Sequence, residues 1–277
     1  MGLFFLFLIG FILAAGLQTL LPGGYDSPAA IRLSLIVQCV AQLLLFFLPA
    51  VLFVVLYKGS AASYLHLDFR GSKWLFAGVA MVLFLLLVPI NDWITWWNDR
   101  WNLGSFEEYM RTLSDASKTA VEKMLSLTTV GDLLLQLFVV ALIPAVCEEL
   151  FFRGALQQIF RQWFGNAHVA IVVTALVFSL AHGDLYGLVP RFVLGLLLGY
   201  LFYLSGSLLV NISAHFFNNA LIVVLYHLYN KGVLLSSPDT PLLMPWLTTL
   251  LCTLAAVALF FLYFVSKDKK TPQKETI

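Results

Sequence analysis

The stretch that decides the fold is LLLQLFVVALIPAVCEELFFRG, residues 133–154. It starts as an apolar run with no charge between Asp132 and Glu148, and it ends with two glutamates and an arginine. About 20 mostly apolar residues are enough for a helix to cross a bilayer. A charge near the bilayer centre costs about 2.5–3.5 kcal/mol on insertion scales. We therefore expect a membrane-spanning helix whose charges either pair with each other or take part in chemistry.

The composition of the whole chain supports a membrane location. The chain has 277 residues, of which 61% are hydrophobic and 11% are charged. Soluble domains are about 45–50% apolar and about 25% charged. The net charge of +1 gives no basic field for a nucleic-acid partner. Cys39, Cys147 and Cys252 all lie in apolar runs, so we expect free thiols and no disulfide framework.

Apolar segments of spanning length recur along the chain, and no strand-like alternation does. We expect an all-α, polytopic integral membrane protein with about eight transmembrane helices. The first segment lacks the basic region of a signal peptide, so we expect it to be a retained span. The expected spans are residues 3–21, 31–57, 74–90, 133–152, 167–182, 188–205, 207–228 and 242–265.

Lys and Arg residues set the expected orientation, because they accumulate on the cytoplasmic side of membrane proteins. The tail KDKKTPQKE, residues 267–275, and the loop 58–73 are basic, and Arg153 and Arg161 follow the fourth span. With eight spans these segments share one side, so both termini are expected to be cytoplasmic. In the longest loop, SFEE at residues 105–108 fits a capping box, which predicts a helix to Leu127 on the outer surface.

The charges at the end of the fourth span have a defined geometry on a helix. Glu149 and Arg153 are spaced i,i+4 with the glutamate first, the favourable order for an ion pair. Glu148 is rotated by about 100° from Glu149, so one arginine cannot serve both carboxylates equally. We expect Glu149 to pair with Arg153 and Glu148 to face elsewhere. The alternative is that all three charges snorkel at the membrane edge.

Two further spans carry polar side chains at their ends or along one face. His182 follows an uncharged run, and Phe178 lies one turn before it on the same face. Asn211, His215 and Asn219 are spaced i,i+4,i+8, which aligns them along one helix face. Taken singly, a histidine near a span end is an interfacial residue, and a polar stripe joins helices.

Taken together, these groups are the set that hydrolysis needs. A carboxylate with a neighbouring imidazole can hold and deprotonate a water molecule. A histidine and an asparagine can donate hydrogen bonds to a developing oxyanion.

The sequences EELFFR, FSLAH and HFFNN fit EExxxR, FxxxH and HxxxN, in this order on successive spans. The chain thereby resembles the CPBP family, the CAAX proteases and bacteriocin-processing enzymes, over roughly residues 133–224. The resemblance implies an intramembrane endopeptidase of about eight helices with its active site in an intramembrane cavity. The first three spans are unmatched. We expect residues 1–130 to form the N-terminal spans and the outer-surface loop helix, 131–230 the catalytic core, and 231–277 the last span and the basic cytoplasmic tail.

The resemblance also implies roles for individual residues. Glu148 would activate water with His182, and His215 and Asn219 would stabilise the oxyanion. Glu149, Arg153 and Phe178 would support them. No cofactor is expected. The family has long been labelled as metalloproteases, so zinc bound by Glu148, His182 and His215 is the alternative, although no HExxH is present.

The expected partners are the lipid bilayer and a membrane-associated peptide or protein substrate. We expect a multi-pass integral membrane protein, and the compact length suggests that the membrane is a bacterial cytoplasmic membrane. A second class of function stays open, in which a transporter, a binding protein or a bacteriocin-immunity protein uses the same polar cavity without catalysis. Intact Glu148, His182, His215 and Asn219 favour the enzyme, since a scaffold needs none of those identities.

Overall fold

The computed structural model describes residues 2–18, 27–58, 67, 73–240 and 242–262, and its regular elements are all helices. The all-α prediction is therefore confirmed for this part of the chain. The basic tail 267–275 and most of the loop 58–73, on which the predicted orientation depends, lie outside the described residues.

Each of the apolar segments expected from the sequence forms helix within its described residues. The segments before the longest loop are α1 (Gly2–Gln18), the consecutive α2 (Pro28–Gln42), η1 (Leu43–Phe47) and α3 (Leu48–Lys58), and α5 (Lys73–Asn98). The fourth segment is a continuous rod made of α7 (Val130–Gln136), η3 (Leu137–Leu142), α8 (Ile143–Glu149), η4 (Leu150–Leu156) and α9 (Gln157–Phe164). The remaining segments are α10 (Ala167–Leu180), α11 (Leu188–Ser205), α12 (Leu208–Asn230) and α13 (Trp246–Phe260).

Among the residues that the structure describes, five helical stretches are long and apolar enough to cross a membrane. They are Pro28–Leu56, Lys73–Asn98, Val130–Phe164, Leu185–Ser205 and Leu208–Asn230. The helices α1, α10 and α13 are apolar but shorter. The chain is thus a multi-pass membrane protein by the length and composition of its helices, and the count of about eight spans stays a prediction.

The predicted capping box is wrong. The surface helix α6 spans Glu107–Met124, and Phe106 at its N-cap makes no side-chain hydrogen bond to the helix. Ser105 lies inside the 3₁₀ turn η2 (Gly104–Phe106). An N-cap side chain must sit on extended backbone to reach the first free N–H groups, and a residue within a turn cannot do so. As expected for a surface helix, α6 is largely exposed.

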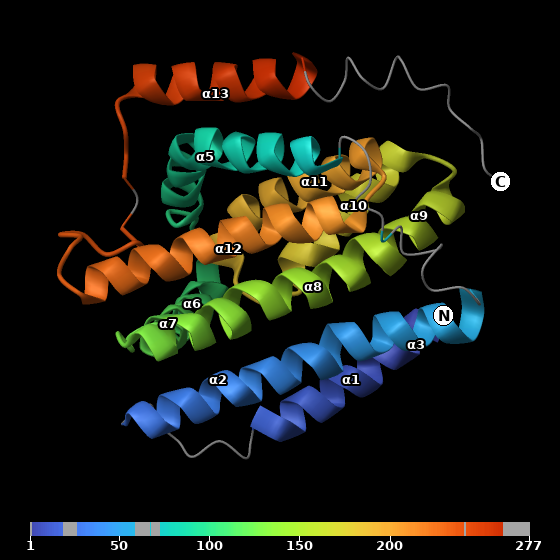
Figure 1. The fold of residues 1–277 in the computed structure, drawn as a ribbon, viewed down its shortest axis with the longest axis horizontal. Coiled ribbons are helices and arrows are strands. Elements are labelled where there is room, and N and C mark those ends of the chain that lie inside the picture. The colour runs from blue at the N-terminus through green and yellow to red at the C-terminus, as the bar shows by residue number, and fades with distance from the viewer. Residues whose placement is uncertain (1, 19–26, 59–66, 68–72, 241, 263–277) are drawn as a thin grey trace.

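The helices pack in layers, as Figure 1 shows. The pair formed by α1 and α2–α3 lies along one side, next to the rod that contains α8. The helices α10, α11 and α12 pack on the other side of that rod, and α5 and α13 lie beyond them. The rod that carries Glu148 is therefore enclosed by helices from both ends of the sequence.

Close helix packing around the rod depends on glycines in α11. A Cβ on Gly195 would come within 3.0 Å of the Cα of Ala175, and one on Gly199 within 2.7 Å of Cγ2 of Ile171. Small residues spaced by four let membrane helices approach closely. Here they bring α11 against α10 and expose α11 carbonyls to side chains of the rod.

Three π-helical turns interrupt the α-helices near the polar residues. Glu148 and Glu149 lie between η3 and η4, and η1 starts directly after Gln42. π-helical turns are rare and frequently occur at functional sites, where they change the direction of neighbouring side chains.

Candidate active site

Glu149 and Arg153 form a fully buried ion pair, as their spacing predicts. Arg153 Nη1 donates to Glu149 Oε1 at 2.7 Å, and both side chains are 0% exposed. Arg153 Nη2 also donates to the carbonyl of Gly195 at 3.1 Å, and its guanidinium lies 4.8 Å from the centre of the Phe178 ring. The snorkelling alternative is wrong for this pair, because packed helices cover both charges.

Glu149 accepts hydrogen bonds from two side chains of α12 in addition to the one from Arg153 of its own rod. His215 Nδ1 lies 2.9 Å from Oε1, and Asn211 Nδ2 donates to Oε2 at 3.1 Å. Asn211 also donates to the carbonyl of Leu198 at 2.6 Å. A carboxylate that only accepts matches these donors, so Glu149 ties the rod to α12 and, through Asn211, to α11.

The contact with Glu149 fixes the proton on the His215 ring. Because the carboxylate only accepts, Nδ1 of His215 must carry a hydrogen. The other ring nitrogen, Nε2, lies 3.9 Å from Oε2 of Glu148. His215 is thus held between the two glutamates and presents Nε2 toward Glu148.

Glu148 is nearly buried, with 5% of its surface exposed. As expected, it does not share Arg153; Gln42 Nε2 donates to its Oε1 at 3.3 Å. Gln42 belongs to none of the three sequence motifs and was not predicted as a site residue. The signal was present, since Ser34, Gln38 and Gln42 repeat the i,i+4,i+8 spacing of polar residues that marks the His215 helix.

His182 and Phe178 lie together at the end of α10. The helix ends at Leu180, so the predicted span is shorter than expected and His182 lies in the following turn, where it is exposed. His182 Nδ1 donates to the carbonyl of Phe178 at 2.8 Å, which leaves the Nε2 lone pair free to accept a hydrogen bond. The Phe178 ring centre lies 5.0 Å from that of His182 and 6.2 Å from that of His215.

Asn219 lies one turn beyond His215 on α12 and is half-buried. It accepts a hydrogen bond from Asn218 at 3.3 Å and takes no part in the network around Glu149. The structure therefore brings Glu148, Glu149, Arg153 and His215 together, and it leaves His182 and Asn219 at the border of this cluster.

Glu148, His182 and His215 are the three residues that would bind zinc in the alternative mechanism. Within the described residues, no three His, Cys, Asp or Glu side chains are grouped closely enough to hold a metal ion. We derive no step through a metal, and the zinc alternative stays a prediction.

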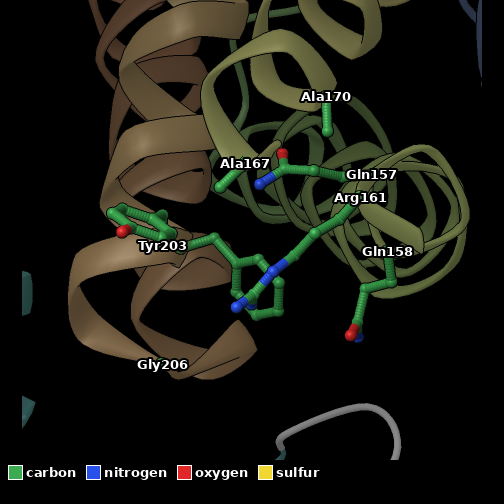
Figure 2. A pocket seen from close by; sticks show the side chains of 8 residues that line it. Gln157, Gln158, Arg161, Ala167, Ala170, Tyr203 and Gly206 are labelled. Atoms are coloured by element: carbon green, nitrogen blue, oxygen red, sulfur yellow. The ribbon is translucent and has the colours of Figure 1, made fainter. Parts of the chain in front are cut away.

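A separate small pocket of 90 Å³ lies between α9 and the start of α10 and end of α11. Figure 2 shows Gln157 and Arg161 extending from α9 toward Ala167 and Gly206, while Gln158 points away. Gln157 donates to the carbonyl of Gly199 at 3.3 Å. None of the predicted catalytic residues lines this pocket.

The comparison with protein families identifies the core. Residues 130–221 match the family described as type II CAAX prenyl endopeptidase Rce1-like. The chain carries a CAAX protease domain. All the predicted site residues lie within this domain, whereas Gln42 lies outside it. No curated protein and no solved structure matches the chain.

The CAAX protease domain confirms the resemblance drawn from the three motifs, and it indicates a peptidase. The apolar helices on both sides of the domain agree with a membrane protease that meets lipid and peptide.

Proposed function

We propose that the protein is an intramembrane endopeptidase that hydrolyses peptide bonds of membrane-associated peptides or proteins with a glutamate-activated water. One observation carries the proposal. Within the CAAX protease domain, Glu148 is buried and not paired with Arg153, and its Oε2 lies 3.9 Å from Nε2 of His215.

Glu148 and His182 are assigned to the water. The Glu148 carboxylate can accept one hydrogen of the water, and the free Nε2 lone pair of His182 can accept the other. Removing a proton from water as it attacks the peptide carbonyl is general-base catalysis, which contributes about 10²–10⁴-fold. Glu148 takes this proton and then gives it to the leaving amine.

His215 and Asn219 are assigned to the oxyanion. Since Nδ1 of His215 donates to Glu149, the ring can donate from Nε2 only as an imidazolium. The negative charge of Glu149 stabilises that cation, so Glu149 acts as a positioning residue for His215. The Asn219 amide would donate the second hydrogen bond.

The proposed setting is an intramembrane cavity within about eight spans, with both termini in the cytoplasm of a bacterium. The substrates are proposed to be membrane-associated peptides or proteins. No cofactor is assigned. The division into N-terminal spans, catalytic core and last span stays a prediction, and Arg32 of α2 crosses its first boundary by pairing with Asp132 at 2.8 Å.

The test compares the proteomes of membranes that contain wild-type protein or the Glu148→Gln variant. We expect new peptide ends in the wild-type membranes only, with equal amounts of folded, inserted protein in both. The matched control is Glu108→Gln, because Glu108 is exposed on α6. Wild-type cleavage by Glu148→Gln would remove the water-activation role. Identical proteomes together with a transport or immunity function that survives the substitution would favour a non-enzymatic protein.

A further inference from the structure

Gln42 occupies a position that the family domain does not explain. It is the last residue of α2, in the N-terminal spans, yet its Nε2 donates to the Oε1 of Glu148 at 3.3 Å. Its own Oε1 is buried and has no hydrogen-bond partner within the described structure. A buried acceptor without a donor costs free energy, which a donor supplied by a ligand would recover.

The orientation of this amide follows from its neighbour. The oxygens of an ionised carboxylate only accept hydrogen bonds, so the NH₂ group of Gln42 must face Glu148 and the carbonyl oxygen must face away. The amide is therefore polarised, with its donor committed to Glu148 and its buried acceptor unpaired.

Gln42 also lines a groove of 410 Å³ between α1 and α2. Gln38 and Ala41 lie beside it on α2, and Ala14 and Ala15 line the side formed by α1. The volume falls within the range of about 300–1,000 Å³ that is common for ligand sites. Gln38 and Gln42 are one helical turn apart, so both amides lie on the face of α2 that borders the groove.

The chemistry of the groove selects a peptide as its occupant. Acyl chains of lipids have no hydrogen-bonding groups, and amides left among them stay unsatisfied. An extended peptide alternates N–H and C=O groups and can satisfy both amides. The alanines leave room for a chain to lie close to the helix backbones.

We infer that the groove between α1 and α2 binds the substrate backbone next to the scissile bond, and that Gln42 is a positioning residue that joins this groove to Glu148. A substrate N–H donates to Gln42 Oε1, which holds the opposite end of the amide on the Glu148 carboxylate. This inference deepens the proposed function and rests on it.

The kinetic test distinguishes the role of the Gln42 amide from that of the Gln38 amide. The probe is a quenched fluorescent peptide that spans a cleavage site found by the comparison of wild-type and Glu148→Gln membranes. Gln42→Met keeps the length of the side chain and removes the amide, so kcat should fall about 10–100-fold, as for a lost hydrogen bond to a charged group. Gln38→Met should raise KM about 2–10-fold and leave kcat unchanged. The control Gln162→Met alters an exposed glutamine of α9 and should match wild type.

A second measurement needs no catalysis. Ala15→Cys is placed in the groove, in Glu148→Gln protein whose Cys39 and Cys252 are replaced by alanine, and its modification by a maleimide is timed with and without the same peptide. We expect the peptide to slow modification in the groove. It should not slow modification of Ile12→Cys, which does not line the groove and is 61% exposed.

The outcomes distinguish the inference from the function it rests on. Wild-type kinetics in both methionine variants, or unprotected Ala15→Cys, would overturn the inference while an inactive Glu148→Gln keeps the protease assignment. An active Glu148→Gln would overturn the protease mechanism itself. A fall in kcat for Gln42→Met that also appears in Gln162→Met would show a general loss of folded protein and would contradict the positioning role.

Discussion

At the scale of single residues, the buried ion pair of Glu149 and Arg153 contributes to the stability of the folded protein and lies within the candidate site. Each carboxylate oxygen and each terminal guanidinium nitrogen of this pair makes a hydrogen bond. Removing one partner leaves a buried charge uncompensated, which costs about 3–5 kcal/mol. We expect Glu149→Ala and Arg153→Ala each to lose that much stability, measured by unfolding in detergent. The double variant should lose less than the sum.

The partly exposed pair of Arg32 and Asp132 is the control for this cycle. Its atoms are almost as close, at 2.8 Å against 2.7 Å, but the Arg32 side chain is 46% exposed. An exposed ion pair contributes about 0–1 kcal/mol, so its coupling energy should be small. A coupling between Glu149 and Arg153 no larger than this control would show that their contact contributes little in the folded protein.

Asn219 provides a second prediction at this scale, because its proposed role is confined to the transition state. Asn219→Ala should lower kcat by about 10²–10³-fold, with a milder effect on KM. Asn218→Ala, which removes the neighbouring amide that donates to Asn219, should have a smaller effect. Steady-state kinetics on the same peptide measure both variants. Equal losses in the two variants would assign Asn219 to packing.

At the scale of elements, the glycine face of α11 determines how closely the helices around Glu149 can pack. A Cβ on Gly199 would meet a methyl group of Ile171, whose branched side chain has little freedom in a helix. Gly199→Ala should therefore cost about 1–3 kcal/mol in detergent unfolding. Gly78→Ala in α5 meets nothing within 4 Å and should cause no loss. An undiminished stability of Gly199→Ala would show that α11 shifts freely on α10.

The π-helical turns act at the same scale. They place Gln42 beside η1 and the two glutamates between η3 and η4, so these three side chains flank a widened turn, whereas His215 lies within the regular helix α12. A π-helical turn rotates the residues that follow it relative to a regular α-helix. The three turns therefore change the facing of polar side chains within otherwise apolar helices.

At the scale of the whole molecule, dependence on a metal can be tested with the purified enzyme. Since Glu148 and His182 are proposed to activate the water directly, we expect activity to survive prolonged chelation, with no stoichiometric metal by elemental analysis. One zinc per chain, lost with activity on chelation and regained on readdition, would replace the glutamate mechanism. In that case Asn219→Ala should cost only about 10–100-fold, as for a residue that orients a metal ligand.

The sequence by itself determined the helical membrane fold and the local ion pair. Backbone groups in lipid must bond within their own segment, so long apolar runs of this composition can only be helices. The pairing of Glu149 with Arg153 follows from one helical turn and needs no other element. The three motifs were sufficient to recognise the protease family, because their order along the chain is itself specific.

Only the tertiary structure decided which groups from different helices meet. The bonds from Asn211 and His215 to Glu149, and from Gln42 to Glu148, join residues between 62 and 106 positions apart. Such contacts depend on the rotation and depth of each helix, which are set by packing at Gly195 and Gly199 and by the π-helical turns. Helical spacing shows which residues share a face of one helix. Packing decides which other helix that face contacts. The hydrogen bond from Gln42 to Glu148 could therefore be found only in the folded protein.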